Sequence, residues 1–186
     1  DSERSRGLGD VYKRQKIMFA CAKWGKRSIV ATHLLESMIE HPTPTRAEVT
    51  DVANAIYEGA DALMLSGETS VGKYPIDCVQ FIKSISEKTE KSKTLGYEKN
   101  LITNSDWESI AVAAKNLAES IQADGIIAVT RTGATASYIS NAKPNGIPIF
   151  AFTNNKHTLK QLSLVGSSYS FYICLLYTSD AADECS

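Results

Sequence analysis

Residues 63–75, "LMLSGETSVGKYP", contain an apolar run that stops at Ser66, a turn with two glycines, and then a proline. The run begins at residue 60 as "ADALMLS", which is the pattern of a short buried strand. Pro75 suits the start of a helix, where a missing N–H costs no hydrogen bond. The stretch therefore predicts a strand, a glycine turn and a helix, which is the repeating unit of parallel α/β folds.

The same turn has the spacing G-x-x-x-x-G-K of a nucleotide-binding P-loop, from Gly67 to Lys73. A P-loop continues with Ser or Thr, because that short hydroxyl binds the magnesium ion on the phosphates. Here the next residue is Tyr74, whose oxygen lies at the end of a rigid ring. The sequence therefore disfavours nucleotide binding through this turn.

Composition limits the class of protein. With 186 residues, the chain is long enough for one large domain or two small ones. A hydrophobic fraction of 43% and a charged fraction of 22% are typical of soluble globular proteins. The net charge of −1 gives no basic surplus, so we expect neither a nucleic-acid nor a membrane partner. The four cysteines form no C-x-x-C pair, which argues against a zinc site and favours a cytoplasmic location.

The two ends of the chain do not share the pattern of their neighbours. Residues 10–15 can be encoded by GAT GTG TAT AAG AGA CAG. The reverse complement of that string, read one base along, encodes residues 174–178 and the start of the codon for Ser179. One oligonucleotide, which resembles a sequencing-library adaptor, thus accounts for both ends. We expect residues 1–15 and 174–186 to be non-native tails that do not contribute to the fold.

Strand and helix signals alternate in the first half of the remaining chain. Strands are predicted at residues 28–32 and 60–66, and helices at 33–41, 44–59 and 74–91. Two helices have an apolar face at helical spacing. The core-facing residues predicted on these faces are Val49, Val52, Ala53 and Ile56 in the middle helix and Ile76, Val79, Phe81 and Ile82 in the last.

The second half repeats this pattern after a polar segment at residues 91–104, which we interpret as a linker. "SDWE" has the form of a capping box, so Ser105 should cap a helix that reaches about Gln122. The sequence then predicts strands at 125–130, 147–153 and 168–173 and helices at 133–142 and 155–165. This is a second, incomplete α/β module.

Polar side chains follow both strands of the first module. In parallel α/β folds, ligands bind where the strands end, so Thr32, Ser66 and Glu68 are candidates for one site. Two hydroxyls and a carboxylate can bind a phosphate or carboxylate, or pass a proton through water. The alternative is structural: Ser66 and Thr69 would cap the next helix, and Glu68 would accept backbone N–H groups. A lone histidine such as His33 is more often structural than catalytic.

A second candidate site follows the first strand of the second module. Its loop, Thr130-Arg131-Thr132-Gly133-Ala134-Thr135, leads into a helix whose first N–H groups favour an anion. Gly133 permits close backbone approach, and the threonine hydroxyls and the arginine can donate hydrogen bonds to a phosphate. The alternative is an ordinary helix-capping turn.

Long stretches of the chain resemble one enzyme family. "VATHLLESMIEHPTPTRAEVTDVANAIYEGADALMLSGETSVGKYP" (30–75) resembles the signature of pyruvate kinases across their seventh and eighth barrel strands. "GIIAVTRTGATASYIS" (125–140) and "IPIFAFTNNKHTLKQLSLV" (147–165) resemble the C-terminal regulatory domain of that family. The lysine turn then corresponds to the turn after the last barrel strand.

The resemblance implies a partial (β/α)₈ TIM barrel, with only its last two βα units, followed by an incomplete three-layer α/β domain. The expected segments are an adaptor-like tail (1–15), the end of the barrel (16–90), a linker (91–104), the truncated effector domain (105–173) and a second tail (174–186).

The resemblance also implies a function for the parent protein. That family transfers a phosphoryl group from phosphoenolpyruvate to ADP with Mg²⁺ and K⁺, as a cytoplasmic homotetramer. Thr32 matches its substrate-contacting threonine, and Ser66 and Glu68 match residues thought to relay a proton with it. Thr130, Arg131, Thr132, Gly133 and Thr135 match the loop that binds a phosphorylated effector. His33 departs from the usual glutamine, which we interpret as a tolerated contact at the subunit interface.

The family's phosphoryl-stabilising lysine and its metal ligands precede the position that matches Lys16. We therefore expect no metal ligand in this chain and no activity from the chain alone. The alternative function is a non-catalytic α/β module that binds a small phosphate through the 130–135 loop.

Overall fold

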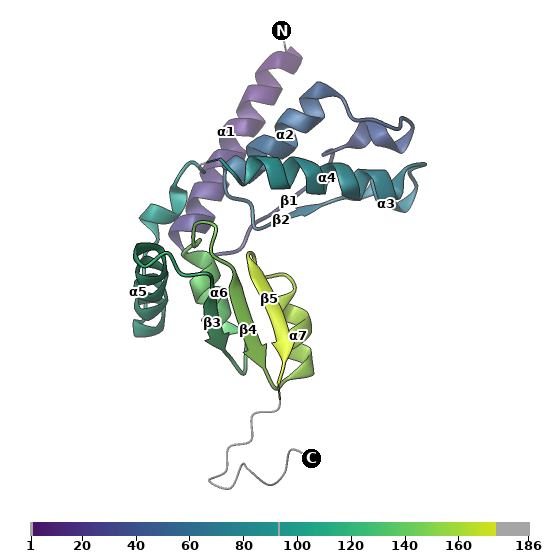
Figure 1. Cartoon of the computed structure of the whole chain (residues 1–186). Helices are drawn as coiled ribbons and strands as arrows, with labels where there is room; N and C mark the ends of the chain where they lie inside the picture. Colours follow the sequence, from purple (N-terminus) through teal and green to yellow (C-terminus); the bar gives the residue numbers. More distant parts are fainter. Residues whose placement is uncertain (1, 93, 174–186) are drawn as a thin grey trace, which may run out of the picture. The chain divides into compact units, whose positions relative to one another are not determined.

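The computed structural model describes residues 2–92 and 94–173, and for residues 2–10 it describes the backbone only (Figure 1). The predicted tail at 174–186 lies outside these residues. The chain divides into two compact units, residues 1–102 and 103–186. Both units are α/β with parallel, open sheets, in agreement with the predicted fold class.

The first unit contains a two-stranded sheet with helices around it. Its elements are α1 (Ser2–Lys23), β1 (Ile29–Ala31), the 3₁₀ helix η1 (Glu36–Ile39), α2 (Arg46–Tyr57), β2 (Ala62–Met64), α3 (Gly67–Ser70), α4 (Pro75–Thr89) and the 3₁₀ helix η2 (Tyr97–Asn100).

Local sequence signals set the ends of its helices. Thr45 caps α2 by a capping box, in which Glu48 supplies both the backbone N–H and the returning carboxylate. After α2, Gly59 takes a φ of 85°, a left-handed conformation that favours glycine. Pro75 occupies the first turn of α4, as its sequence predicts. These signals explain why α2 and α4 form close to their predicted positions.

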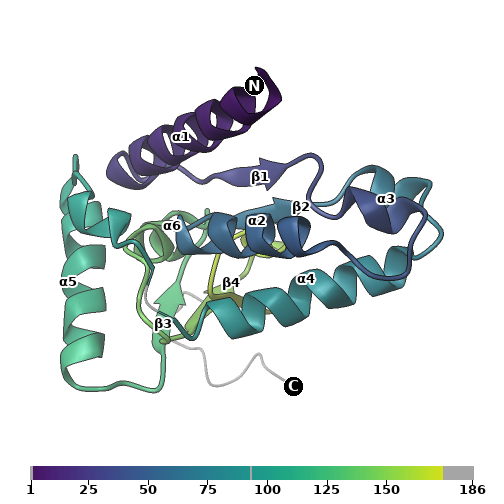
Figure 2. The ribbon, with the colours of Figure 1, turned by 90° about the horizontal axis from the view of Figure 1, so that it is seen from above.

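Strands β1 and β2 pair in parallel, and α2 and α4 pack beside them (Figure 2). Apolar side chains of both helices and both strands meet in one core. Its buried members are Leu34, Leu35, Met38, Val52 and Cys78. The two βα units thus share a single core, as adjacent units of a parallel barrel do.

Two details differ from the sequence prediction. Residues 33–41 form only the four-residue helix η1, and the left-handed backbone conformation of His33 excludes that residue from an α-helix. In α4, Phe81 and Ile82 face the core as predicted, whereas Ile76 and Val79 are exposed. Cys78 is fully buried instead, so the apolar face is rotated from the predicted one.

Helix α1 runs without a break through residue 15, the predicted end of the first tail. Its Arg14 forms a bidentate ion pair with the buried Glu58, at 2.8 Å from Nε to Oε2 and 3.1 Å from Nη2 to Oε1. Burial of an unpaired carboxylate is costly, so this pair anchors α1 to the end of α2. The tail boundary itself remains a prediction, but Arg14 has a structural contact in this chain.

The second unit contains three parallel strands in the order β3-β4-β5. Its elements are α5 (Asp106–Ser120), β3 (Ile126–Val129), α6 (Ala134–Asn141), β4 (Ile149–Thr153), α7 (Lys156–Leu162) and β5 (Ser168–Tyr172). Ser105 caps α5 as predicted, and its hydroxyl accepts the N–H of Glu108 at 3.3 Å. The Glu108 carboxylate accepts the N–H of Asn104.

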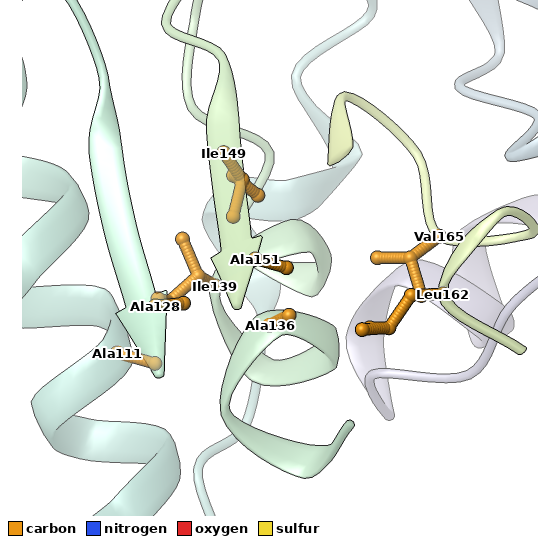
Figure 3. Close-up of a cluster of buried hydrophobic side chains, with 8 residues drawn as sticks. All are labelled: Ala111, Ala128, Ala136, Ile139, Ile149, Ala151, Leu162 and Val165. Atoms are coloured by element: carbon orange, nitrogen blue, oxygen red, sulfur yellow. The ribbon is translucent and has the colours of Figure 1, made fainter. Parts of the chain in front are cut away.

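One face of this sheet forms a core with α5, α6 and α7. Figure 3 shows apolar side chains of the strands facing those of the helices. The core consists of Ala111, Ala128, Ala136, Ile139, Ile149, Ala151, Leu162 and Val165.

The opposite face is largely apolar and exposed. We call it the open sheet face, and its most exposed members are Ile127, Val129, Tyr169 and Phe171. Phe150 and Phe152 of β4 stack on the aromatic rings of β5. Parallel sheets are normally covered on both faces, so this face is unusual for a finished domain.

Candidate functional site

The candidate catalytic residues lie at one edge of the β1–β2 sheet. Ala31 pairs with Met64 at the end of the parallel ladder, so the two strands end together. Thr32 follows β1 directly, and Ser66 lies two residues beyond β2. Both side chains belong to exposed residues. The register therefore brings the two hydroxyls to the same sheet edge, where ligands bind in parallel α/β folds.

The backbone at Thr32 is strained. Thr32 and the following His33 have φ values of 71° and 53°, which place both in the left-handed region. This region is unfavourable for a β-branched residue, at about 1–2 kcal/mol. Strain of this kind persists only where neighbouring contacts hold it, and it is concentrated at functional sites. His33 itself makes an exposed contact with Glu36, at 2.8 Å from Nδ1 to Oε2.

Glu68 is buried below this edge and contacts both strand-end segments. Its Oε1 accepts the N–H of Leu35 at 3.2 Å, and its Oε2 accepts the N–H of Ser66 at 2.8 Å. Burial raises the pKa of Glu68, but the N–H groups of Glu68, Ser66 and Leu35 together outweigh burial and leave the pKa below its usual value. Glu68 is therefore an ionised carboxylate that joins the two loops.

The alternative prediction is a structural role, in which Ser66 and Thr69 cap α3 and Glu68 accepts backbone N–H groups. Of these three residues, only Glu68 does so. Ser66 precedes α3 but its side chain makes no capping hydrogen bond. Thr69 donates a long hydrogen bond of 3.4 Å to the carbonyl of Ser66. Among the described residues, the hydroxyls of Thr32 and Ser66 have no hydrogen-bond partner. These two exposed hydroxyls are therefore available to hydrogen-bond another molecule.

Glu48 contacts the same region and was not among the predicted site residues. Its Oε1 accepts the N–H of Ser37 at 2.7 Å, and its Oε2 accepts the Ser37 hydroxyl at 2.5 Å. Ser37 belongs to η1, which follows the Thr32 loop. The signal was present, because "TRAE" (45–48) has the same capping-box pattern as "SDWE" (105–108).

The lysine of the P-loop-like turn has a structural partner. Lys73 forms an ion pair with Glu40, and its N–H donates to the carbonyl of Ile39. At Gly72, a Cβ would lie 2.4 Å from the carbonyl oxygen of Glu68, so this glycine is required by close packing. The turn thus packs against η1 and does not form a phosphate cradle.

The 130–135 loop of the second unit is fixed by two hydrogen bonds that involve side chains. Thr130 is buried, and its Oγ1 accepts the N–H of Gly133 at 2.9 Å. The hydroxyl of Thr158 in α7 donates to the carbonyl of Arg131 at 2.9 Å. Gly133 has a φ of 87° and directly precedes α6. The loop is therefore held in place by its own backbone contacts and by α7.

The remaining polar side chains of this loop are exposed. Arg131, Thr132 and Thr135 make no side-chain hydrogen bond with any described residue. Gly133 offers no side chain to cap α6, so the first N–H groups of this helix have no side-chain cap. A rigid loop, an uncapped helix start and three exposed donors suit a phosphate group.

The part of the chain that the structure describes contains no group of three or more His, Cys, Asp or Glu side chains placed to bind a metal ion. Nor is any helix within the described ranges both long and apolar enough to cross a membrane.

Two protein-family models match the chain, one for each unit. The model of the pyruvate kinase barrel domain matches residues 7–79, and the model of the pyruvate kinase alpha/beta domain matches residues 108–184. The chain belongs to the pyruvate kinase family. The parallel β1–β2 pair is therefore part of a pyruvate kinase barrel, and the β3-β4-β5 sheet is part of its α/β domain.

Individual pyruvate kinases are similar over most of the chain. A pyruvate kinase of Agrobacterium vitis is 45% identical over 161 residues, which cover 84% of this chain and 34% of that protein. The chloroplastic pyruvate kinase isozyme G of Nicotiana tabacum is 38% identical over 91% of this chain and 30% of its own length. The crystal structure of a pyruvate kinase from Cryptosporidium parvum superposes with a TM-score of 0.83 at 32% identity, over 90% of this chain and 35% of that one. The chain thus spans about a third of the length of the relatives that it matches.

Proposed function

We propose that this chain is a fragment of a pyruvate kinase that transfers a phosphoryl group from phosphoenolpyruvate to ADP, giving pyruvate and ATP. One observation supports the role of this fragment most directly. The exposed hydroxyls of Thr32 and Ser66 share a sheet edge, with the ionised Glu68 bound to the N–H of Ser66. By the family resemblance, we expect the complete enzyme to be a cytoplasmic homotetramer that uses Mg²⁺ and K⁺.

The proposed chemistry of this edge is proton delivery. When the phosphoryl group leaves phosphoenolpyruvate, the remaining enolate of pyruvate must gain a proton at carbon. A hydroxyl at Thr32 or Ser66, or a water bound to both, donates that proton and regains one from solvent. The negative charge of Glu68 keeps the Ser66 turn in place through its hydrogen bond to the Ser66 N–H. We assign Thr32 to substrate contact as well.

Phosphoryl transfer itself requires groups outside this chain. Such transfer depends on positioning and on neutralisation of the developing negative charge, which metal ions and cationic side chains supply. The described residues provide no metal-binding cluster. By the family resemblance, which places the phosphoryl-stabilising lysine and the metal ligands before the position that matches Lys16, we propose that the isolated chain is inactive and that the complete protein is the enzyme.

The 130–135 loop is proposed as the effector site. Arg131, Thr132 and Thr135 supply the donors, while the buried Thr130 and Gly133 shape the loop. A sugar phosphate or a nucleoside monophosphate would bind with its phosphate at the start of α6. If the catalytic proposal is wrong, this loop still supports the alternative of a non-catalytic phosphate-binding module.

The test is turnover of the complete protein encoded by the source gene. Pyruvate formation that depends on ADP and phosphoenolpyruvate is expected for the wild-type enzyme. Thr32→Val removes one hydroxyl and keeps the branched shape, so turnover should fall about 10²-fold or more, as is typical for proton-transfer groups. Thr50→Val, on an exposed position of α2, is the matched control and should change little. Wild-type turnover in Thr32→Val would remove Thr32 from the site.

A further inference from the structure

The loop that carries Thr32 is held by two carboxylates from different parts of the chain. Glu68, next to the end of β2, accepts the N–H of Leu35. Glu48, in the first turn of α2, accepts both the N–H and the hydroxyl of Ser37. The residues between Thr32 and Ser37 are thus fixed at two points just after the strained left-handed pair.

Glu48 makes more hydrogen bonds than helix capping requires. Besides its two contacts with Ser37, its Oε2 accepts the N–H of Thr45 at 2.7 Å and the Thr45 hydroxyl at 2.8 Å. Burial raises the pKa of Glu48, but these four hydrogen bonds outweigh burial and leave the pKa below its usual value. Hydrogen bonds to an ionised acceptor are about twice as strong as neutral ones.

Glu108 provides an internal comparison. It occupies the same position of α5 that Glu48 occupies in α2, three residues after the capping residue. Its carboxylate accepts the N–H of Asn104, and Ser105 accepts its N–H. Both of these hydrogen bonds lie at the start of its own helix, whereas Glu48 also contacts a second segment.

We propose that Glu48 is a positioning residue for the proton delivery assigned to the Thr32 edge: it fixes Ser37, and through the 32–37 loop it places the Thr32 hydroxyl at the substrate. This inference rests on the proposed function of Thr32. The physical basis is that two adjacent left-handed residues are unfavourable, so the loop relaxes unless contacts on its far side hold it. A displacement of about 1 Å at a reacting group can cost 10²-fold in rate.

The test uses the complete enzyme and three variants. Glu48→Gln removes the charge, Ser37→Ala removes one contact with Glu48 but leaves the α2 cap intact, and Glu108→Gln is the matched capping control. Amide hydrogen exchange of the 33–37 segment is measured without substrate, and kcat and KM are measured with phosphoenolpyruvate and ADP. The exchange rate of this segment should increase at least 10-fold in Glu48→Gln and by a smaller factor in Ser37→Ala. It should not change in Glu108→Gln. In Glu48→Gln, kcat should fall about 10-fold.

A double variant separates positioning from general stability. Because Glu48 acts through the Thr32 hydroxyl, Thr32→Val combined with Glu48→Gln should turn over like Thr32→Val alone. A residue that only stabilises the fold would lower kcat by the same factor in both backgrounds, and that result would overturn the inference. Unchanged exchange at 33–37 in Glu48→Gln would overturn it too, and so would faster exchange with unchanged kcat. A wild-type enzyme that forms no pyruvate contradicts the proposed function instead, and the exchange data then decide alone whether Glu48 holds the loop.

Discussion

Glu68 is buried and ionised because backbone N–H groups replace the hydrogen bonds that water would donate. The carboxylate accepts N–H groups from two segments, residues 35 and 66, that are far apart in the sequence. A neutral side chain would accept these hydrogen bonds less strongly. The charge of Glu68 thus contributes to the stability of the first unit, because it strengthens the hydrogen bonds that join these two segments.

This link predicts a pH dependence of stability. The folded-state pKa of Glu68 is lowered, so its contribution is complete above the unfolded pKa of about 4.3 and is lost as the pH falls through the folded value. Glu68→Gln should therefore lower the free energy of unfolding by about 1–3 kcal/mol at pH 7, and by less at pH 3.

Urea unfolding of the 186-residue chain at both pH values measures this difference. Glu87→Gln, which changes an exposed carboxylate of the same unit, is the control and should have little effect at either pH. An equal loss at pH 3 and pH 7 in Glu68→Gln would mean that its charge does not stabilise the fold.

Single site residues were predictable to different degrees. Thr32 and Ser66 follow directly from the strand pattern, because the residue after a parallel strand lies at the ligand-binding edge. The left-handed conformation of Thr32 was not predictable, because the loop that follows it is held by Glu68 and Glu48, which lie elsewhere in the sequence. Glu48 was missed because its capping-box pattern indicates only a local role, whereas its contact with Ser37 depends on the fold.

At the scale of elements, the second unit follows its sequence closely. All three strands and both helices between them form within the predicted ranges, because each has a clear apolar pattern and a terminating glycine, asparagine or proline. The first unit is less regular. The predicted helix at 33–41 shortens to η1, and the exposed Ile76 and Val79 show that an apolar pattern does not fix which face is buried.

The prediction at the scale of elements concerns the loop between β3 and α6. In the complete enzyme, Thr132→Ala with Thr135→Ala removes two exposed hydroxyls but leaves the contacts of Thr130, Gly133 and Thr158 intact. Activation by phosphorylated metabolites should disappear, while turnover without effector should stay within about twofold, because surface substitutions change stability little.

Turnover measured across a set of sugar phosphates and nucleoside monophosphates tests this expectation. Ser109→Ala, in the first turn of α5, is the control, since its hydroxyl bonds only to its own helix. If every activating metabolite still activates the double variant, the loop is an ordinary capping turn.

At the scale of the whole chain, both units expose apolar surface that a finished domain covers. On the open sheet face, the exposed fraction is 70% for Ile127 and 59% for Tyr169. In the first unit, Ile29 of β1 and Met64 of β2 are also exposed. The relatives are about two and a half to three times as long as this chain, so we expect the missing parts of the parent to cover these surfaces.

The isolated chain should consequently self-associate, because exposed apolar patches of this kind drive association. Ile127→Lys combined with Phe171→Lys places charges on the open sheet face and should shift the chain toward the monomer. Sedimentation velocity at several protein concentrations measures the change.

Val71→Lys is the control for this experiment, because Val71 is exposed in a turn of the other unit. It should leave the association unchanged. A wild-type chain that stays monomeric at every concentration would show that the open sheet face does not drive association.

The two carboxylates that hold the Thr32 loop also have a consequence for inheritance. The loop lies at residues 32–37, and the two carboxylates that hold it belong to Glu48 and Glu68. A genetic crossover between related genes can therefore separate the loop from these carboxylates. A crossover between residues 38 and 47 would take the loop from one parent and both carboxylates from the other. Chimeric enzymes joined in that interval should keep full turnover only when both parents carry matching residues at these positions. Residues 32–68 therefore form a block that recombination is expected to transmit whole.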